Sequence, residues 1–316
     1  VIDDPTVSDP EPTQTLCQNA TTPALIILDV IASGGTGTFS YQWYENTVSS
    51  TTGTLIIGET NSTFTPPTAT IGTMYYYCIV TQTGSGCETT STISELIITP
   101  GPSFVDQPIG DTVCVGAIIN PMSVSYTNGT GTANYQWYEN GIQIAGATLD
   151  NYTPSTSIVG TLSYYCIIDL SQSGCSPITS TTAEIMVVDH PSINIQPTAN
   201  QTICVGGNAN TLNVGYINGI GNPTYQWYEN GIPIAGATTD NYTPPTYTTI
   251  GTYDYYCEIT LSGNGCNLAT SNTAVVDVID DPTVSDPEPT QTLCQNATTP
   301  ALIILDVIAS GGTGTF

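Results

Sequence analysis

The chain has 316 residues, of which 26 are acidic and none is Lys or Arg, so its formal net charge is −26. Without cations it cannot displace counterions from phosphates, which excludes nucleic acid and anionic membrane surfaces as partners. Ion pairs with Lys or Arg are excluded too, so stability must come from burial, strand hydrogen bonds and disulfides. The longest apolar run, residues 24–32, is broken by Asp29 and is too short to span a bilayer.

The first predicted domain covers residues 1–100 and opens with an acidic, Pro-rich entry. Apolar positions that alternate with polar ones predict β-strands. The expected strands are residues 24–32, the stretch around Trp43, residues 74–82 and residues 90–99. A glycine loop precedes the Trp strand, and the segment Thr65-Pro66-Pro67 is predicted to form a bend. The sequence therefore predicts an all-β domain.

The same order of elements recurs in residues 101–190 and 191–279, which are the second and third predicted domains. Both contain the segment YQWYENGI. Its Asn-Gly pairs, Asn140-Gly141 and Asn230-Gly231, predict two-residue type I′ hairpin turns, because Asn and Gly tolerate positive φ angles. Short linkers that contain Pro favour a stiff, extended arrangement of the domains, about 100 Å for three of them.

Residues 278–316 are identical to residues 1–39, which gives a period of 277 residues. Residues 280–316 would then supply only the first strands of a further copy of the first domain. One interpretation is that the chain is a window on a longer array of repeats. The alternative is a filament subunit whose last strands complete the next subunit by strand donation.

Each unit has a Trp that is followed, after 27 to 33 positions, by the Tyr of a Tyr-x-Cys motif, and this spacing resembles the immunoglobulin fold. The resemblance implies a core of Trp43, Trp137, Trp227, Tyr76, Tyr164 and Tyr255, with each Tyr forming a tyrosine corner. The preceding Cys lies 23 to 26 positions before its Trp, too far for the usual cysteine of the second strand. The fold class predicted is tandem immunoglobulin-like β-sandwiches arranged as an extended rod.

The phrases CVGG, GGTGTFSYQWY, YTPPT, GTMYYYC and SGC resemble the Ig-like repeats of giant secreted surface proteins of Bacteroidetes. This resemblance covers the whole chain. It implies an extracellular or cell-surface adhesin or filament, often exported by type IX secretion. Its partners would be neighbouring repeats or copies of itself, with glycans or other cell surfaces as further candidates. A structural stalk or filament segment is therefore the predicted function, with a strand-donation subunit and a glycan-binding module as alternatives.

Ten cysteines fall into three classes, which we call a (before the second strand), b (in the aromatic strand) and c (before the last strand). Class a is Cys17, Cys114, Cys204 and Cys294; class b is Cys78, Cys166 and Cys257; class c is Cys87, Cys175 and Cys266. Such a chain is expected to be oxidised. Zinc is a poor interpretation, because there is no CxxC motif and only one His.

Three cysteines per unit allow several disulfide pairings, and each pairing leaves the third class of cysteine unpaired. Classes a and b could pair within a domain, for example Cys114 with Cys166. Class a of one domain could instead pair with class c of the next, for example Cys17 with Cys175, which would tie neighbouring domains together. Classes b and c are a third pairing. In the resembled group, relatives with two cysteines per unit keep a and c, which favours a pairing that includes c.

No residue pattern predicts an enzyme. His190 is expected to be a solvated linker residue, and Glu45, Glu139 and Glu229 lie one per domain, too far apart to be paired acids. No cofactor is expected; acidic residues that cluster at the last junction are a weak candidate site for Ca²⁺, because carboxylate oxygens are its usual ligands. Its candidate ligands are Asp277, Asp280, Asp281 and Asp286.

Two further expectations concern the surface. The segment Asp111-Thr112-Val113 resembles the O-glycosylation motif of Bacteroidetes, which makes Thr112 a glycosylation candidate. The aromatic run Tyr75-Tyr76-Tyr77 alternates between strand faces, and we expect core roles for it, with a carbohydrate-binding face as the alternative.

Overall fold

The structure is a computed structural model that describes residues 4–286, 295 and 307–311. Its elements are strands and one 3-10 turn, Ser171–Ser173. No helix long and apolar enough to cross a membrane occurs among the described residues.

The chain divides into two compact units. One unit consists of residues up to 111, 119–154 and 162–185, and the other of residues 112–118, 155–161 and those from 186 onward. The division cuts through the second predicted domain.

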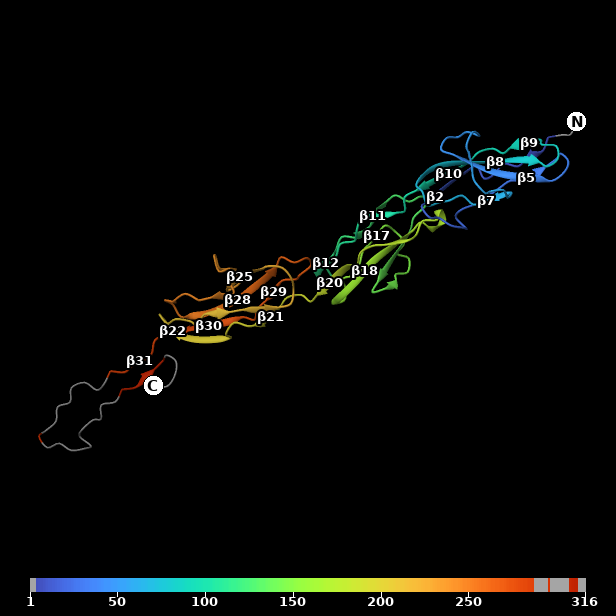
Figure 1. Cartoon of the computed structure of the whole chain (residues 1–316). Coiled ribbons are helices and arrows are strands. Elements are labelled where there is room, and N and C mark those ends of the chain that lie inside the picture. Colours follow the sequence, from blue (N-terminus) through green and yellow to red (C-terminus); the bar gives the residue numbers. More distant parts are fainter. Residues whose placement is uncertain (1–3, 287–294, 296–306, 312–316) are drawn as a thin grey trace. The chain divides into compact units, whose positions relative to one another are not determined.

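In the first domain, one large sheet has the strand order β2-β10-β8-β5-β6, and β9 pairs with β8 (Figure 1). The bounds are Thr13–Cys17 for β2, Phe39–Asn46 for β5, Thr54–Leu55 for β6, Gly72–Gln82 for β8, Glu88–Thr90 for β9 and Ser94–Thr99 for β10. β2 runs parallel to β10, and every other pair in this sheet is antiparallel.

Two short strand pairs form the other layer. β1 (Thr6–Val7) pairs with β4 (Ala32–Ser33), and β3 (Leu28–Asp29) pairs with β7 (Thr63–Phe64). A large sheet that carries Trp and Cys on adjacent strands, faced by such a second layer, is the immunoglobulin-like sandwich.

The third domain repeats this architecture with the order β22-β30-β28-β25-β26, β29 pairing with β28, and the pairs β21-β24 and β23-β27. Its strands are β21 Ser192–Ile195, β22 Asn200–Cys204, β23 Leu212–Asn213, β24 Gly215–Ile217, β25 Pro223–Glu229, β26 Ile232–Pro233, β27 Asn241–Tyr242, β28 Gly251–Leu261, β29 Ala269–Thr270 and β30 Ala274–Ile279. β31 (Thr283–Val284) then pairs with β32 (Ala309–Ser310) in the register of β1 and β4.

The second domain has the order β12-β20-β18-β15-β16, β19 pairing with β18, and the pairs β11-β14 and β13-β17. Its strands are β11 Ser103–Asp106, β12 Asp111–Cys114, β13 Met122–Ser123, β14 Ser125–Thr127, β15 Asn134–Glu139, β16 Ile142–Gln143, β17 Asn151–Tyr152, β18 Gly160–Asp169, β19 Ile178–Thr179 and β20 Ala183–Val188. All-β tandem Ig-like domains are therefore confirmed as the fold class.

Each core is centred on its Trp, which is fully buried at Trp43, Trp137 and Trp227. The indole N–H of each Trp donates a 2.9 Å hydrogen bond to a backbone carbonyl, so the buried polar group is satisfied. The predicted type I′ turns are confirmed by positive φ angles at Asn140 and Gly141 and at Asn230 and Gly231.

Two predicted strands of the first domain are interrupted. Residues 24–27 are not in a strand, because the side chain of Gln14 exchanges two hydrogen bonds with the backbone of Ile26 in place of a strand partner. Residues 90–99 are divided between β9 and β10. At the break, the Ser91 hydroxyl accepts a 3.0 Å hydrogen bond from the Cys78 N–H and donates to the Thr92 carbonyl.

The strand-donation alternative depends mainly on residues 287–294, 296–306 and 312–316, which lie outside the described residues, as does Cys294.

Candidate functional site: the disulfide-linked joints

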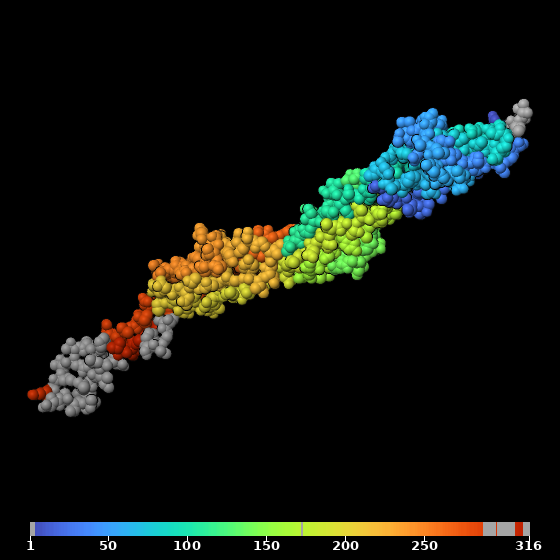
Figure 2. Space-filling view, viewed as in Figure 1, coloured from blue at the N-terminus to red at the C-terminus, as the bar shows by residue number. Residues whose placement is uncertain are grey.

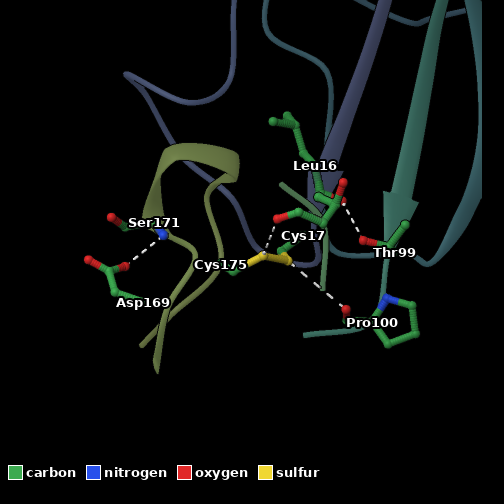
Figure 3. Close-up of a disulfide and its surroundings, with 8 residues drawn as sticks. Leu16, Cys17, Thr99, Pro100, Asp169, Ser171 and Cys175 are labelled. Carbon is green, nitrogen blue, oxygen red and sulfur yellow. Dashed lines mark hydrogen bonds between the residues drawn. A yellow bond between two sulfur atoms is a disulfide. The ribbon is translucent and has the colours of Figure 1, made fainter. Parts of the chain in front are cut away.

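The first joint lies between the first and second domains and is closed by a disulfide between Cys17 and Cys175 (Figure 3). The two Cα atoms are 4.9 Å apart, within the normal range for a disulfide. Both side chains are buried. In Figure 2 the yellow-green surface around residues 162–185 lies against the blue surface of the first domain.

Local structure places each cysteine at this joint. Cys17 ends β2 opposite Thr99, so it lies where the last strand of its domain ends. Cys175 follows the 3-10 turn at the tip of the β18–β19 hairpin, and the Ser171 N–H donates a 2.7 Å hydrogen bond to Asp169 that holds this tip. Gly174 adopts φ +73°, and a Cβ there would come within 2.3 Å of the Ala20 Cβ.

Backbone contacts complete the first joint. The Gly129 N–H, in the loop after β14, donates a 2.9 Å hydrogen bond to the Pro100 carbonyl in the linker. The Sγ of Cys17 lies 4.0 Å from the same carbonyl oxygen, and the Sγ of Cys175 lies 3.8 Å from the Thr130 carbonyl oxygen. The linker is thereby tied to the second domain by the hydrogen bond between Gly129 and Pro100.

The second joint has the same construction in the other unit. Cys114 is bonded to Cys266, with Cα atoms 5.0 Å apart. The Gly219 N–H donates to the Asp189 carbonyl at 2.9 Å, as Gly129 does to Pro100. A Cβ on Gly265 would lie 2.3 Å from the Ala117 Cβ, which repeats the close contact of Gly174 with Ala20.

Asn264 adds contacts that are specific to the second joint. Its carbonyl accepts a 3.0 Å hydrogen bond from the Cys114 N–H, and its side-chain amide donates to the Ile118 carbonyl at 3.1 Å. His190 accepts a hydrogen bond from the Asn267 N–H through Nδ1, at 3.2 Å. His190 thus lies in the linker and contacts the hairpin tip that carries Cys266.

Of the pairings left open by the sequence, class a of one domain with class c of the next is the one formed at both joints. The intradomain pairing of Cys114 with Cys166 is not formed. The strand register of the first domain gives the reason: Cys17 lies opposite Thr99, and Ile98 lies opposite Gly72. Cys17 is thus level with a point about seven residues from Cys78 along β8, or roughly 20 Å, which no disulfide can bridge.

Class b cysteines are buried free thiols that lie opposite the Trp of the adjacent strand. Burial raises the pKa of Cys78, Cys166 and Cys257 to about 11. Such thiols are poor nucleophiles at neutral pH, so they act as small core residues. Cys87 of class c and Cys204 of class a are the half-buried free cysteines among the described residues.

In the second and third domains, the buried tyrosines Tyr164 and Tyr255 bind glutamates rather than forming tyrosine corners. The hydroxyl of Tyr164 donates to Glu139 and that of Tyr255 to Glu229, each at 2.7 Å across adjacent strands. These two glutamates therefore each have a hydrogen-bond partner within their own domain. In the first domain burial, with a smaller contribution from the charge of Glu45, raises the pKa of Tyr76 to about 12.

The run Tyr75-Tyr76-Tyr77 has three different surroundings. Tyr76 packs in the core. Tyr77 stacks on Tyr44, with 5.1 Å between the ring centroids. The Tyr75 hydroxyl donates a 3.0 Å hydrogen bond to Glu95. Tyr138 with Tyr165, and Tyr228 with Tyr256, repeat the stacked pair at 4.9 and 4.8 Å. A carbohydrate-binding face stays a prediction.

The remaining candidates lie on the surface. Asp277 accepts a 2.6 Å hydrogen bond from the Thr252 hydroxyl, and Asp280, Asp281 and Asp286 are exposed. No group of three or more His, Cys, Asp or Glu side chains that could hold a metal ion occurs in the described part of the chain. Thr112 is exposed on β12, two residues before Cys114, and its glycosylation stays a prediction.

Comparisons with known proteins were made by sequence and by structure. A sequence family described as a domain of unknown function (DUF8696) matches residues 194–280. No curated protein matches the chain.

Several solved structures with tandem Ig domains resemble the fold. Domains I67–I69 of titin (an E-to-A variant) are 13% identical, with coverage of 88% of this chain and 99% of that one and a TM-score of 0.47. Extracellular domains 3–5 of Drosophila OTK are 16% identical, with coverage of 87% and 97% and a TM-score of 0.34. The three N-terminal domains of the bacteriophage RB49 outer capsid protein Hoc are 12% identical, with coverage of 88% and 99% and a TM-score of 0.42. Similarity this low says nothing of function.

Proposed function

We propose that this chain is a structural segment of a bacterial extracellular adhesin or surface fibre. The observation that carries the proposal is the repeated joint, in which class a of one domain is bonded to class c of the next at Cys17–Cys175 and at Cys114–Cys266. The first and second domains, and the second and third, are thus each joined by two covalent connections, the linker and the disulfide. A second connection restricts hinge motion at the linker, as a spacer or fibre requires.

The two disulfides also overlap along the sequence, which changes how the chain would respond to tension. Their sequence separations are 158 and 152 residues, and the shared stretch runs from Cys114 to Cys175. A force path from Cys17 to Cys266 can cross both bonds and needs only that stretch, about 60 residues instead of about 250. Domains that unfold under load would therefore lengthen the chain little.

Composition supports an exposed location. Disulfides persist in oxidising compartments, and a chain without Lys or Arg offers trypsin no cleavage site. The resemblance to Bacteroidetes surface repeats adds the expectation of type IX secretion and of a place on the cell exterior. Neighbouring repeats are the partners that this role needs.

Antibody labelling of the intact bacterium that produces the chain tests the proposal. We expect immunogold particles on fibres or on the outer surface in electron micrographs of unpermeabilised cells. Label that appears only after permeabilisation would contradict the proposal. Small-angle scattering of the oxidised chain provides a second test, with an expected length of about 100 Å for the three domains; a compact particle would contradict it.

A further inference from the structure

Each of the two free, half-buried cysteines belongs to a class whose other described members are bonded. Class a is bonded at Cys17 and Cys114, but Cys204 is free; class c is bonded at Cys175 and Cys266, but Cys87 is free. Cys204 ends β22 opposite Ile279, as Cys17 ends β2 opposite Thr99. The two free cysteines are therefore complementary halves of the joint that the chain forms twice.

The surroundings of Cys204 carry the other parts of the first half. Ala20 and Ala117 stand three residues after their class a cysteines, and Gly207 takes this position after Cys204. Asp280 takes the linker position of Pro100 and Asp189, whose carbonyls accept the loop N–H at the two closed joints. An open groove next to this end is lined by residues that include Val205, Ile250 and Asp280.

The surroundings of Cys87 carry the second half. Gly86 precedes it as Gly174 precedes Cys175, and its φ of +72° matches the +73° of Gly174. A Cβ on Gly174 would collide with Ala20, but a Cβ on Gly86 would meet nothing within 4 Å. Gly35 holds the position of Gly129, the donor to the linker carbonyl. This tip of the first domain thus has the conformation of a joint and an open face.

The sequence says which domain would meet Cys204. Residues 278–316 are identical to residues 1–39, so the unit that follows the third domain begins as the first domain does. The class c cysteine of that domain type is Cys87. The partner of Cys204 is therefore expected to be the tip of another copy of the first domain.

We propose that Cys204 forms a disulfide with Cys87 of the next copy of the 277-residue repeat, which makes every joint in an array covalent. The inference rests on the proposed structural role and extends it to a partner, a second copy of this repeat. In the reaction, two thiols lose two protons and two electrons to a disulfide oxidant, which is reduced to a dithiol, and one S–S bond forms. The same class of oxidant forms the two bonds already present.

The test uses an extended chain in which residues 40–277 are appended after Phe316, so that a whole second repeat follows the first. The protein is alkylated without reduction and digested with pepsin and a glutamate-specific protease, since trypsin has no site. We expect a linked peptide pair containing Cys204 and Cys87. In this chain the Cys204 of the second repeat is replaced by Ser, so that the alkylated Cys204 peptide reports the first repeat alone. Its amount should fall at least tenfold relative to the 316-residue chain.

Two matched variants identify which copy supplies the partner. Cys87→Ser in the second repeat should restore alkylation of the first Cys204, and Cys87→Ser in the first repeat should not. A Cys204–Cys87 link found in dimers on non-reducing gels, and absent from monomers, would still support the joint, with separate chains as the source. Cys204 that stays fully alkylated, or that links to any other cysteine, would overturn the inference.

The same peptide map separates this inference from the proposed function. If the Cys17–Cys175 and Cys114–Cys266 links are present but Cys204 is alkylated, only the inference fails. If neither link is found, the proposed function loses its main support.

Discussion

At the residue scale, buried side chains with raised pKa values make the folded state less stable at alkaline pH. Burial raises the pKa of Cys78 from 9.0 to about 11, and it raises the pKa of Tyr76 from 10.0 to about 12, with a smaller contribution from Glu45. The folded state holds these protons more tightly than the unfolded state. The stabilisation is therefore complete below pH 9 and is lost as the pH rises toward 11 or 12.

We predict that the free energy of unfolding falls steeply between pH 9 and pH 11, by about 2 kcal/mol for each class b thiol. Urea denaturation at a series of pH values measures it. A variant with Cys78→Ala, Cys166→Ala and Cys257→Ala should be less stable at every pH because of the cavities, but its pH dependence in this range should be weaker. An equal slope in the two proteins would show that the thiols are not the cause.

Thiol exposure gives a second prediction at this scale. In the 316-residue chain at neutral pH, Cys87 and Cys204 should react with iodoacetamide, whereas Cys78, Cys166 and Cys257 should react only after denaturation. Peptide mass spectrometry after a short pulse of reagent measures the labelling of each site. Labelling of class b in the native protein would contradict the buried positions described above.

At the scale of elements, the tip of the last hairpin makes the joint. Gly174 and Gly86 have the same backbone conformation, so an Ala at either position bears the same φ strain. Only Gly174→Ala would also force its Cβ against Ala20. We predict that Gly174→Ala lowers stability by at least 1 kcal/mol more than Gly86→Ala does.

Thermal or chemical denaturation of the two variants measures this difference, with Gly265→Ala as the repeat at the second joint, where Ala117 is the neighbour. Equal effects of Gly174→Ala and Gly86→Ala would mean that the tip does not pack as closely as described.

Sequence reasoning was most successful where a local rule decides the structure. The Asn-Gly turns and the aromatic strands follow from φ preferences and alternation, and the Trp residues lie in the cores as the resemblance implied. It failed where a distant side chain decides. Gln14 replaces a strand partner for Ile26, and Ser91 interrupts the last strand by binding the backbone of Cys78. The spacing of residues along the sequence predicts neither of these hydrogen bonds.

The disulfide pairing shows the same limit. From the sequence, classes a and b could pair within a domain, but the strand register separates them along the sheet. The Ser-Gly-Cys sequence before the last strand was the signal that could have indicated the pairing, because a hairpin tip that carries a cysteine faces the neighbouring domain. The glutamate partners of Tyr164 and Tyr255 were missed because cross-strand pairs depend on register too.

At the scale of the whole molecule, the overlapping bonds should limit extension. We predict that stretching the oxidised chain between anchors near Cys17 and Cys266 gives a contour length of about 200 Å after unfolding, against about 900 Å when the disulfides are reduced. Single-molecule force spectroscopy measures both. Cys175→Ser with Cys266→Ser is the control, and it should behave as the reduced chain does even under oxidising conditions.

The most direct test of the covalent joints is a disulfide map of the 316-residue chain, alkylated at low pH and digested without reduction. We predict linked peptides that contain Cys17 with Cys175 and Cys114 with Cys266, and an unlinked, alkylated Cys166. Links within a domain, such as Cys114 with Cys166, would contradict the account.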